Sequence, residues 1–247
     1  MAQQEGEARA PSRRSAAMIA DKIAQVNARI ASACAAAGRP VQSVTLLAVS
    51  KTFGAADLAA AHAAGQHRFG ENYVQEALAK IAALRALEPR PEWHLIGPLQ
   101  SNKTRVVAES FDWVHSVDRL QVAERLSAQR PEALVPLSVC LQVNVSGEAS
   151  KSGVAPSDLA PLAHAVAALP RLRLRGLMAI PAPALGSAAQ RRPHRLLRGC
   201  LEALRGDGLE LDTLSAGMSD DLEAAILEGS TLVRVGTAIF GSRSPDG

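Results

Sequence analysis

Short apolar runs alternate along the chain with longer segments in which apolar residues recur at helical spacing. The short runs are typical of buried strands, and we expect eight, at residues 44–50, 67–72, 92–97, 112–117, 137–145, 172–180, 211–217 and 232–240. The spacing between them predicts helices near residues 55–65, 73–87, 101–110, 118–129, 156–169, 194–206 and 219–229. One further helix is expected ahead of the first strand, from Ser15 to Ala37, where Gly38 and Pro40 stop it.

Strands that alternate with helices are joined by crossover connections, so they pair in parallel. In a chain of 247 residues, eight such units predict an α/β fold, a single-domain (β/α)8 TIM barrel over residues 15–241 with an extra N-terminal helix. A doubly wound open sheet is the competing fold, but no glycine-rich turn follows the first strand. Residues 1–14 and 242–247 are expected to be flexible tails.

Composition narrows the class of protein. The chain is 47% hydrophobic and carries a net charge of +3, but only 3% of its residues are aromatic and no basic run is interleaved with them. Nucleic-acid binding is therefore not expected. The N-terminus lacks the apolar segment of a signal peptide, and no stretch is long enough to cross a bilayer. We expect a cytoplasmic protein without membrane contact, and a monomer.

Cysteine and histidine point to no metal site. Cys34, Cys140 and Cys200 are odd in number and widely spaced, so they suggest packed thiols rather than disulfides or metal ligands. The six histidines form no H-x-H or H-x-x-x-H pair. The nucleophile elbow G-x-S-x-G and the P-loop pattern are also missing from the sequence. The chemistry must therefore come from other polar residues.

Lys51 ends the first predicted strand, in SVTLLAVSKTFG, although only five of the 27 basic residues are lysines. An amine can lose its proton and attack a carbonyl group, whereas a guanidinium cannot. Active sites of such barrels lie at the carboxyl ends of the strands, where Lys51, Asn72, Asn144 and Arg234 would meet. Lys51 is thus a candidate Schiff-base lysine with a pKa lowered by the barrel interior; the alternative is a strand-end lysine that reaches solvent.

Arg234 lies within the last predicted strand. Val233 and Val235 share one face of that strand, so Arg234 takes the other. A buried guanidinium needs acceptors, which are supplied either at a functional site or by a core carboxylate such as Glu71. The residues alone leave both interpretations open.

The segment SAGMSDDLEAAI predicts a helix start, with Ser219 as N-cap and Asp220 and Asp221 in the first turn. Ser219 and backbone N–H groups could also bind an anion, to which Gly236 and Thr237 could add donors. The loops after strands 7 and 8 often bind phosphate in such barrels. The two aspartates count against an anion unless they point outward.

These segments together resemble the family of pyridoxal 5′-phosphate (PLP) homeostasis proteins, the bacterial YggS and eukaryotic PROSC group. The resemblance runs in order from about Val41 to Gly241. It is carried by LLAVSKT, FGENYVQEALAKI, EWHLIGPLQSNKTR, FDWVHSVDR, LQVNVSGEASKSG, LRGLMAIPAP, DTLSAGMSDDLEAAI and GSTLVRVGTAIFG.

The resemblance implies a fold like the N-terminal barrel of alanine racemase, with PLP bound as a covalent imine to Lys51. It also implies that Asn72 lies beside the ring and that Arg234 hydrogen-bonds the pyridine nitrogen. The remaining cofactor-binding residues that we expect are Ser219, Gly236 and Thr237 at the phosphate, Met178 and Met218 in the pocket lining, and Ser215 nearby.

Two positions and one longer stretch depart from the family pattern. Ala216 stands where the family commonly has Met or Leu, and Phe53 stands where members often have a second lysine. The latter argues against lysine-to-lysine transfer of the cofactor beside Lys51. The stretch ALGSAAQRRPHRLLRG is also atypical.

A permanent donor such as Arg234 would leave the facing ring nitrogen unprotonated, which makes PLP a poorer electron sink. Racemases of this fold supply a tyrosine from an additional domain, whereas the only tyrosine here is Tyr73. We therefore expect a protein that binds PLP and supplies it to PLP-dependent apoenzymes, without robust turnover and with no catalytic residue assigned. The alternatives are a weak amino-acid racemase using Lys51 and another base, and a Schiff-base aldolase whose strand 7–8 loops hold a sugar phosphate.

Overall fold

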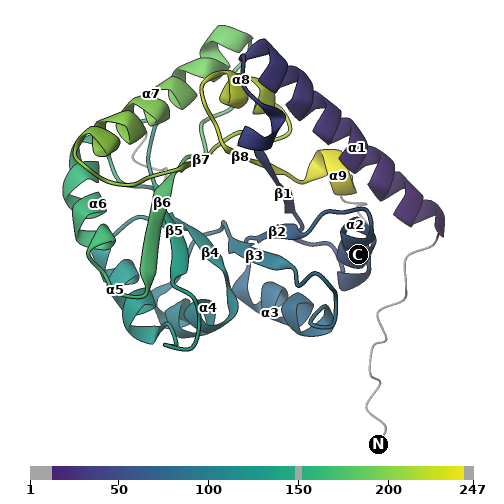
Figure 1. The fold of residues 1–247 in the computed structure, drawn as a ribbon, viewed down its shortest axis with the longest axis horizontal. Helices are drawn as coiled ribbons and strands as arrows, with labels where there is room; N and C mark the ends of the chain where they lie inside the picture. Colours follow the sequence, from purple (N-terminus) through teal and green to yellow (C-terminus); the bar gives the residue numbers. More distant parts are fainter. Residues whose placement is uncertain (1–12, 148–151, 242–247) are drawn as a thin grey trace, which may run out of the picture.

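Eight parallel strands close into a barrel in the order β1 to β8, with the helices outside it (Figure 1). This computed structural model describes residues 13–147 and 152–241. The strands are β1 (Thr45–Val49), β2 (Arg68–Glu71), β3 (Glu92–Leu95), β4 (Trp113–Val117), β5 (Leu137–Gln142), β6 (Leu172–Met178), β7 (Thr213–Ser215) and β8 (Leu232–Val235). Because β1 pairs with β8 as well as with β2, the predicted (β/α)8 barrel is confirmed and the open sheet is wrong.

The helices follow the strands in the predicted alternation. They are α1 (Arg13–Ala36), α2 (Ala55–Ala63), α3 (Val74–Ala83), α4 (Thr104–Ser110), α5 (Leu120–Gln129), α6 (Leu159–Ala167), α7 (Ser187–Gly206), α8 (Leu222–Leu227) and α9 (Thr237–Phe240), with 3-10 turns η1 (Val41–Ser43), η2 (Ser101–Lys103) and η3 (Pro156–Asp158). The predicted tails at 1–14 and 242–247 lie outside the described residues, except that α1 already begins at Arg13.

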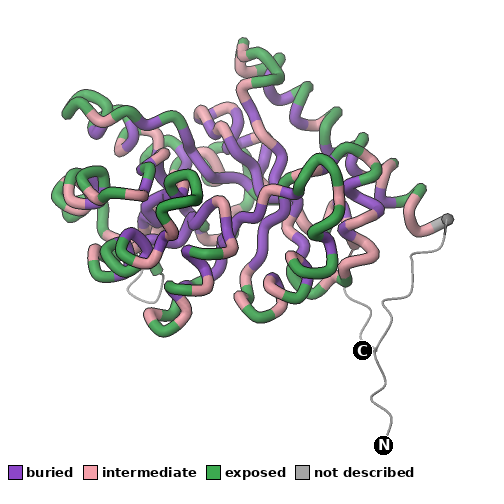
Figure 2. The backbone as a smooth tube through the Cα atoms, turned by 60° about the horizontal axis from the view of Figure 1, so that its bottom comes forward, coloured by how far each residue is buried: buried purple, intermediate pink, exposed green. Residues whose placement is uncertain are grey.

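Two apolar layers stabilise the barrel. The larger lies between strands and helices and contains Val233 and Val235, while Leu47, Ile96 and Leu232 pack together inside. Figure 2 shows the buried strands at the centre, with exposure rising toward the outer helices. This alternation is what period-2 side-chain geometry requires, and it turns Arg234 into the barrel interior as predicted.

The N-terminal helix α1 lies along the outside of the barrel next to α2, α8 and α9 (Figure 1). Its buried side chains recur every three or four residues, at Ile19, Ile23, Val26 and Ile30. This one-sided apolar stripe is the reason that the helix packs on the barrel.

The prediction of a strand over residues 232–240 is wrong beyond Val235. At Gly236 the backbone turns to φ −116° and ψ −70°, and Thr237–Phe240 form the short helix α9. The ring of Phe240 then stacks on Phe53, with centroids 4.9 Å apart. The last apolar run therefore covers two elements, because its second half packs back on the β1–α2 loop rather than continuing the sheet.

The atypical stretch around residues 184–199 forms the first half of α7, seven residues earlier than the predicted start at 194. Arg191 and Arg195 of this helix bind Glu228, whose side chain is 1% exposed, at 2.6 and 2.9 Å. Arg198 lies 3.7 Å from the same carboxylate. These ion pairs attach α7 to the end of α8, and the helix continues through Pro193.

The three cysteines are free; Cys34 and Cys140 are buried and Cys200 is half-buried. This confirms the prediction of packed thiols. No helix within the described ranges is both long and apolar enough to cross a bilayer.

Candidate functional site

A cavity of about 720 Å³ opens at the carboxyl end of the barrel, over the ends of β1, β2 and β8. It brings together seven predicted site residues: Lys51, Asn72, Met218, Ser219, Arg234, Gly236 and Thr237. Neighbouring lining residues include Tyr73, Phe53, Ile180 and Asp220. The mouth of the barrel therefore joins parts of the chain that lie far apart in sequence.

Lys51 lies in the turn directly after β1 and is exposed at the cavity. Its amine has no hydrogen-bond or ion-pair partner among the residues that the structure describes. The next residue, Thr52, has a φ of +71°, which a β-branched residue rarely adopts. Its N–H donates to Glu76 Oε1 at 2.5 Å, so α3 fixes the strained turn that carries Lys51.

The buried side chain of Lys80 stabilises this turn through three hydrogen bonds. Its Nζ donates to the carbonyl oxygen of Ser50 at 2.7 Å, to Glu71 at 2.8 Å and to Glu76 at 2.6 Å. Ser50 Oγ also donates to Glu71, at 2.6 Å. Burial raises the pKa of Glu71, although the hydrogen bonds from Lys80 and Ser50 oppose that shift. The turn is thus supported by a buried ion pair.

Arg234 is 3% exposed and touches the cavity from inside the barrel. Its Nη1 donates to the carbonyl oxygen and the hydroxyl of Ser215 at 2.5 and 2.8 Å, and its Nη2 donates to Ala179 O at 2.8 Å. Burial lowers its pKa to about 10, so it remains a cation at neutral pH. The alternative of a salt bridge to Glu71 is wrong, because Glu71 binds Lys80 instead.

The Asn72 side chain presents a buried oxygen, Oδ1, with no hydrogen-bond partner in the described part of the chain. Its backbone is tightly placed, since a Cβ on Gly97 would lie 2.3 Å from Asn72 O. A Cβ on Gly236 would likewise lie 3.0 Å from Val49 O. Glycine at 97 and 236 therefore allows the ends of neighbouring strands to come close below the cavity.

The loop that carries Ser219 is held from three sides. Arg29 of α1 donates to Ser219 O at 2.8 Å, and Asp221 accepts hydrogen bonds from Met218 N at 2.7 Å and from His194 at 2.9 Å. Burial alone would raise the pKa of Asp221, but these two donors hold it below its usual value. Asp221 therefore faces away from the cavity, whereas the exposed Asp220 lines it, so the condition that both aspartates point outward is met by Asp221 alone.

The prediction that Ser219 is an N-cap is wrong. Residues 219–221 form a turn, closed by the bond from Asp221 N to Met218 O, and α8 begins only at Leu222. The turn leaves the Ser219 side chain at the cavity instead of using it for the helix.

Two predicted site residues lie behind the cavity lining. Met178 is fully buried with Trp113 and Cys140 inside the barrel, and Ser215 is fully buried against Arg234. Asn144 is also not in the lining; its Oδ1 accepts from Gly147 N at 3.1 Å within its own loop. The sequence predicts where each strand ends, but it does not predict which strand ends line the same cavity.

Sequence reasoning missed Lys80, His94 and His115. Lys80 had a weak signal, since Glu76 precedes it by four residues on a helix. His94 lies between Trp93 and Leu95 on β3 and His115 between Val114 and Ser116 on β4, and strand alternation places both histidine side chains inside the barrel. No group of three or more histidine, cysteine or acidic residues that could hold a metal occurs in the described ranges.

Comparison with known proteins gives consistent results. Residues 22–244 match the family model described as alanine racemase, N-terminal domain. The pyridoxal phosphate homeostasis protein of Pseudomonas aeruginosa is 64% identical over 225 residues, covering 91% of this chain and 96% of that protein. The protein with the same name from Escherichia coli K12 is 54% identical over 226 residues, covering 91% and 97%.

Solved structures agree. PipY of Synechococcus elongatus, determined with PLP bound, is 40% identical and superposes with a TM-score of 0.80 over 90% of this chain and all of that one. Alanine racemase of Corynebacterium glutamicum, at 19% identity and a TM-score of 0.68, covers 94% of this chain and 62% of its own, and shares the fold. At these levels of identity and coverage, the chain belongs to the family of pyridoxal phosphate homeostasis proteins.

Proposed function

We propose that this protein binds PLP in the cavity at the barrel mouth, holds it as an imine on Lys51, and supplies it to PLP-dependent apoenzymes. The observation that carries the proposal is that the amine of Lys51, which has no partner among the described residues, and the buried guanidinium of Arg234 line one cavity. The PLP bound in the related PipY structure and the names of the relatives support it.

The residues present fit the cofactor. The cavity lining offers the amine of Lys51 for an aldehyde, and it also contains Asn72, whose buried Oδ1 has no hydrogen-bond partner within the described ranges. Arg234 adds a donor for a ring nitrogen, and the hydroxyls of Ser219 and Thr237 are donors for a phosphate. The cavity volume of about 720 Å³ lies within the range of small-molecule sites.

The covalent step uses only Lys51. Its ammonium gives up one proton to water, and the nitrogen lone pair forms a bond with the aldehyde carbon of PLP. The nitrogen loses a second proton, and the carbonyl oxygen takes up two protons, one from the nitrogen and one from water, and leaves as water, so that a protonated carbon–nitrogen double bond remains. No oxidant or reductant is required, and water reverses the step.

When bound, PLP supplies an electron sink for carbanions at an amino acid Cα, and the strength of that sink depends on its ring nitrogen. The Arg234 guanidinium can donate hydrogen bonds but has no acceptor atom. A ring nitrogen that faces it must therefore accept, and stays unprotonated. The protein therefore binds the cofactor while weakening its catalytic power, as a carrier requires.

The mouth is open enough to release the cofactor. Tyr73 and Met218, both in the cavity lining, are 59% and 37% exposed. Amines from solution can therefore reach Lys51. We infer that exchange of the imine with another amine frees the aldehyde end, after which the noncovalent contacts alone retain PLP.

Weak racemisation is a second candidate, favoured by one observation. Tyr73 lines the cavity together with Lys51, so two groups able to carry protons lie at the same mouth. A racemase assay across common amino acids with the wild type and with Tyr73→Phe separates this candidate from a carrier. Turnover that depends on Tyr73 would favour racemisation.

The proposal is tested by reduction and peptide mapping. The PLP-loaded protein should be yellow, and borohydride should fix PLP on the peptide that contains Lys51. Lys51→Ala should abolish the visible absorbance while the protein stays folded, and Lys103→Ala is the control that should retain it. PLP fixed on another lysine of Lys51→Ala would contradict the assignment.

A further inference from the structure

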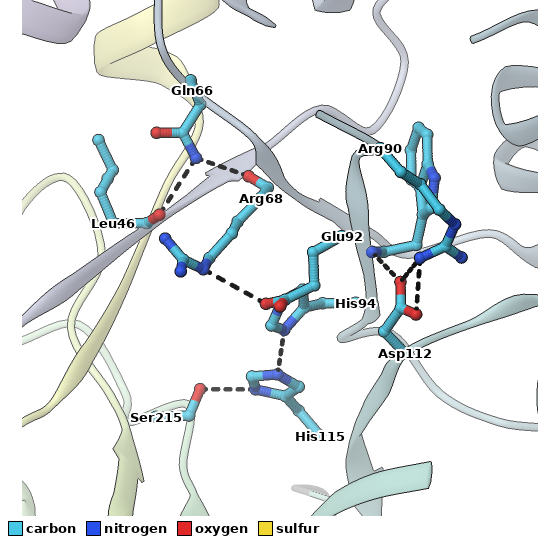
Figure 3. A network of polar contacts seen from close by, with 10 residues as sticks. Leu46, Gln66, Arg68, Arg90, Glu92, His94, Asp112, His115 and Ser215 are labelled. Atoms are coloured by element: carbon cyan, nitrogen blue, oxygen red, sulfur yellow. Dashed lines mark hydrogen bonds and ion pairs between the residues drawn. The ribbon is translucent and has the colours of Figure 1, made fainter. Parts of the chain in front are cut away.

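A chain of buried polar side chains runs through the barrel interior from Arg234. Arg234 Nη1 lies 2.8 Å from Ser215 Oγ, which lies 2.8 Å from His115 Nδ1. His115 Nε2 lies 2.9 Å from His94 Nδ1, and His94 Nε2 lies 2.7 Å from Glu92 Oε1. Figure 3 shows the part from Ser215 to Glu92. The members come from β8, β7, β4 and β3, so they meet across the barrel.

Donors and acceptors in this chain can be assigned from its two ends. A guanidinium only donates and a carboxylate only accepts, so Arg234 donates to Ser215 and His94 Nε2–H donates to Glu92. A neutral His94 then accepts at Nδ1 from His115 Nε2–H. His115 in turn accepts at Nδ1 from the Ser215 hydroxyl. Every hydrogen bond points from Arg234 toward Glu92.

The surroundings keep both histidines neutral, as this assignment requires. Burial lowers the pKa of His94, although its hydrogen bond with Glu92 opposes that shift. Burial, together with His94 and the charge of Arg234, lowers the pKa of His115 well below its usual value. Both rings are fully buried, and the His94 ring stacks on Trp113 with centroids 5.3 Å apart. Glu92 and Arg234 are thus the charged ends of a neutral chain.

The chain connects the two faces of the barrel. Its Glu92 end lies in a second cavity, of about 620 Å³, at the amino ends of the strands. There Glu92 is half-exposed and pairs with Arg68 at 3.3 Å. The other charged groups in this cavity are paired with each other: Arg90 with Asp112 and Arg175 with Asp212. Glu92 is linked to the barrel interior through its hydrogen bond with His94.

We propose that Glu92, His94, His115 and Ser215 are positioning residues that orient and polarise Arg234. Through them, the charge of Glu92 on the far face of the barrel affects how strongly Arg234 donates a hydrogen bond to the PLP ring nitrogen. This rests on the proposed function, because it takes PLP to face Arg234. It gives the far cavity a role, since a ligand or substitution that displaces Glu92 alters the cofactor site without touching it.

The mechanism is a reversal of the donor and acceptor roles in the hydrogen bonds that join Ser215, His115 and His94. Without the Glu92 carboxylate, Arg68 loses its partner and becomes a donor near His94 Nε2. Both histidines then carry their hydrogen on Nδ1, and Ser215 accepts from His115 and Arg234 together. A hydroxyl that donates onward is a better acceptor than one that does not, because hydrogen bonds in series strengthen one another. Ser215 then binds Arg234 less well, and Arg234 donates more strongly to the ring nitrogen.

The first test needs no cofactor. In apoprotein with 15N-labelled histidine, both His94 and His115 should carry their hydrogen on Nε2, as read from 15N chemical shifts. In Glu92→Gln the amide oxygen still accepts, so both should stay on Nε2. In Glu92→Leu both should move to Nδ1. His94 or His115 with hydrogen on Nδ1 in the wild type would overturn the proposal, whatever happens in the variants.

The second test uses protein loaded with PLP labelled with 15N at the ring nitrogen. In Glu92→Leu and Ser215→Ala the ring resonance should move toward the pyridinium position, and in Glu92→Gln it should move less. Asp212→Asn is the matched control, since it removes a carboxylate from the same cavity but lies off the chain. A ring resonance unchanged in all three chain variants, or moved equally in Asp212→Asn, would overturn the coupling.

The two tests separate this inference from the proposed function. If PLP does not bind, or if its ring resonance is the same in Arg234→Gln as in the wild type, the proposed function fails. The 15N shifts of the histidines still show in which direction the hydrogen bonds between Arg234 and Glu92 point. If PLP binds and responds to Arg234→Gln but not to Glu92→Leu or Ser215→Ala, only the present inference fails.

Discussion

The ammonium group of Lys80 lies 2.7 Å from the carbonyl oxygen of Ser50, the residue that precedes Lys51. This contact joins the α3 helix to the turn that presents the proposed Schiff-base lysine. Lys80 also neutralises Glu71, whose side chain is fully buried. One side chain thus supports both the local fold and the position of the Lys51 amine.

Replacing Lys80 by methionine should destabilise the protein by about 3–5 kcal/mol, because it leaves the buried Glu71 carboxylate without its cation. Urea unfolding at pH 7.5 measures this change. In the folded fraction, imine formation at Lys51 should slow as the turn loses its anchor.

The double variant Lys80→Met with Glu71→Gln is the control for this prediction. Removing both charges should recover most of the lost stability, since the penalty comes from the unpaired charge and not from the loss of the pair itself. If the double variant is as unstable as Lys80→Met alone, the destabilisation has another cause.

Arg234→Glu should change the electronics of bound PLP more than its retention. A carboxylate facing the ring nitrogen favours the protonated ring, which is a better electron sink. Exchange of the Cα hydrogen of L-alanine with deuterated water should therefore be at least about tenfold faster, equivalent to about 1.4 kcal/mol of barrier. NMR measures the exchange.

Folding must be verified first by circular dichroism, because a buried glutamate is costly. The comparison with Arg234→Gln then separates charge from size, since the amide cannot protonate the ring. Equal exchange in the folded Glu and Gln variants would contradict a contact between position 234 and the ring nitrogen.

The barrel itself could be predicted because each strand and helix carries its own periodicity, and eight alternating units close in one way. The boundaries at 232–240 and at Ser219 could not. The run LVRVGTAIF is uniformly compatible with a strand, and only the contact of Phe240 with Phe53 shows that it turns back at Gly236. Likewise, Ser219 has the side chain of an N-cap, but Asp221 closes the turn instead.

The cavity lining followed from strand ends and from the family resemblance, whereas the groups behind it did not. Ser215 belongs to the same segment as Ser219, yet it faces Arg234 within the barrel. The alternation of β7 and β8 places both inside, but which polar groups meet there depends on the stagger of strands around the barrel. The pairing of His94 with His115 was unpredictable for the same reason.

Stability should fall as the pH drops below about 6.5, the usual pKa of histidine in an unfolded chain. His94 and His115 have lowered pKa values in the folded state, so they remain neutral there while the unfolded chain takes up protons. The unfolded state then binds more protons, and the free energy of unfolding decreases with falling pH. Each histidine contributes at most about 1.4 kcal/mol per pH unit.

Urea unfolding at pH 7.5 and pH 5.5 measures this dependence. His115→Gln removes one of the two groups and should reduce the pH dependence by about 1 kcal/mol per unit. His164→Gln, on the surface helix α6, is the control and should leave it unchanged. A wild type whose stability is equal at both pH values would contradict the assignment of neutral histidines.

Delivery of PLP is the last prediction. PLP-loaded protein mixed with a PLP-dependent apoenzyme should restore the activity of that enzyme, and free amino acid should accelerate the transfer. Under the proposed function, the amino acid would attack the imine at Lys51 and leave PLP held only by noncovalent contacts. Hydrogen bonds to charged groups are each worth about 1.5–3 kcal/mol, so the covalent bond is the slow barrier to release.

A PLP scavenger in the mixture distinguishes the routes. Activation that persists with the scavenger means direct transfer between the two proteins, since no cofactor passes through solution. Activation abolished by the scavenger means release followed by rebinding. No activation in either case, with the apoenzyme competent toward free PLP, would contradict the role of a carrier and leave storage of the cofactor or weak catalysis as the remaining functions.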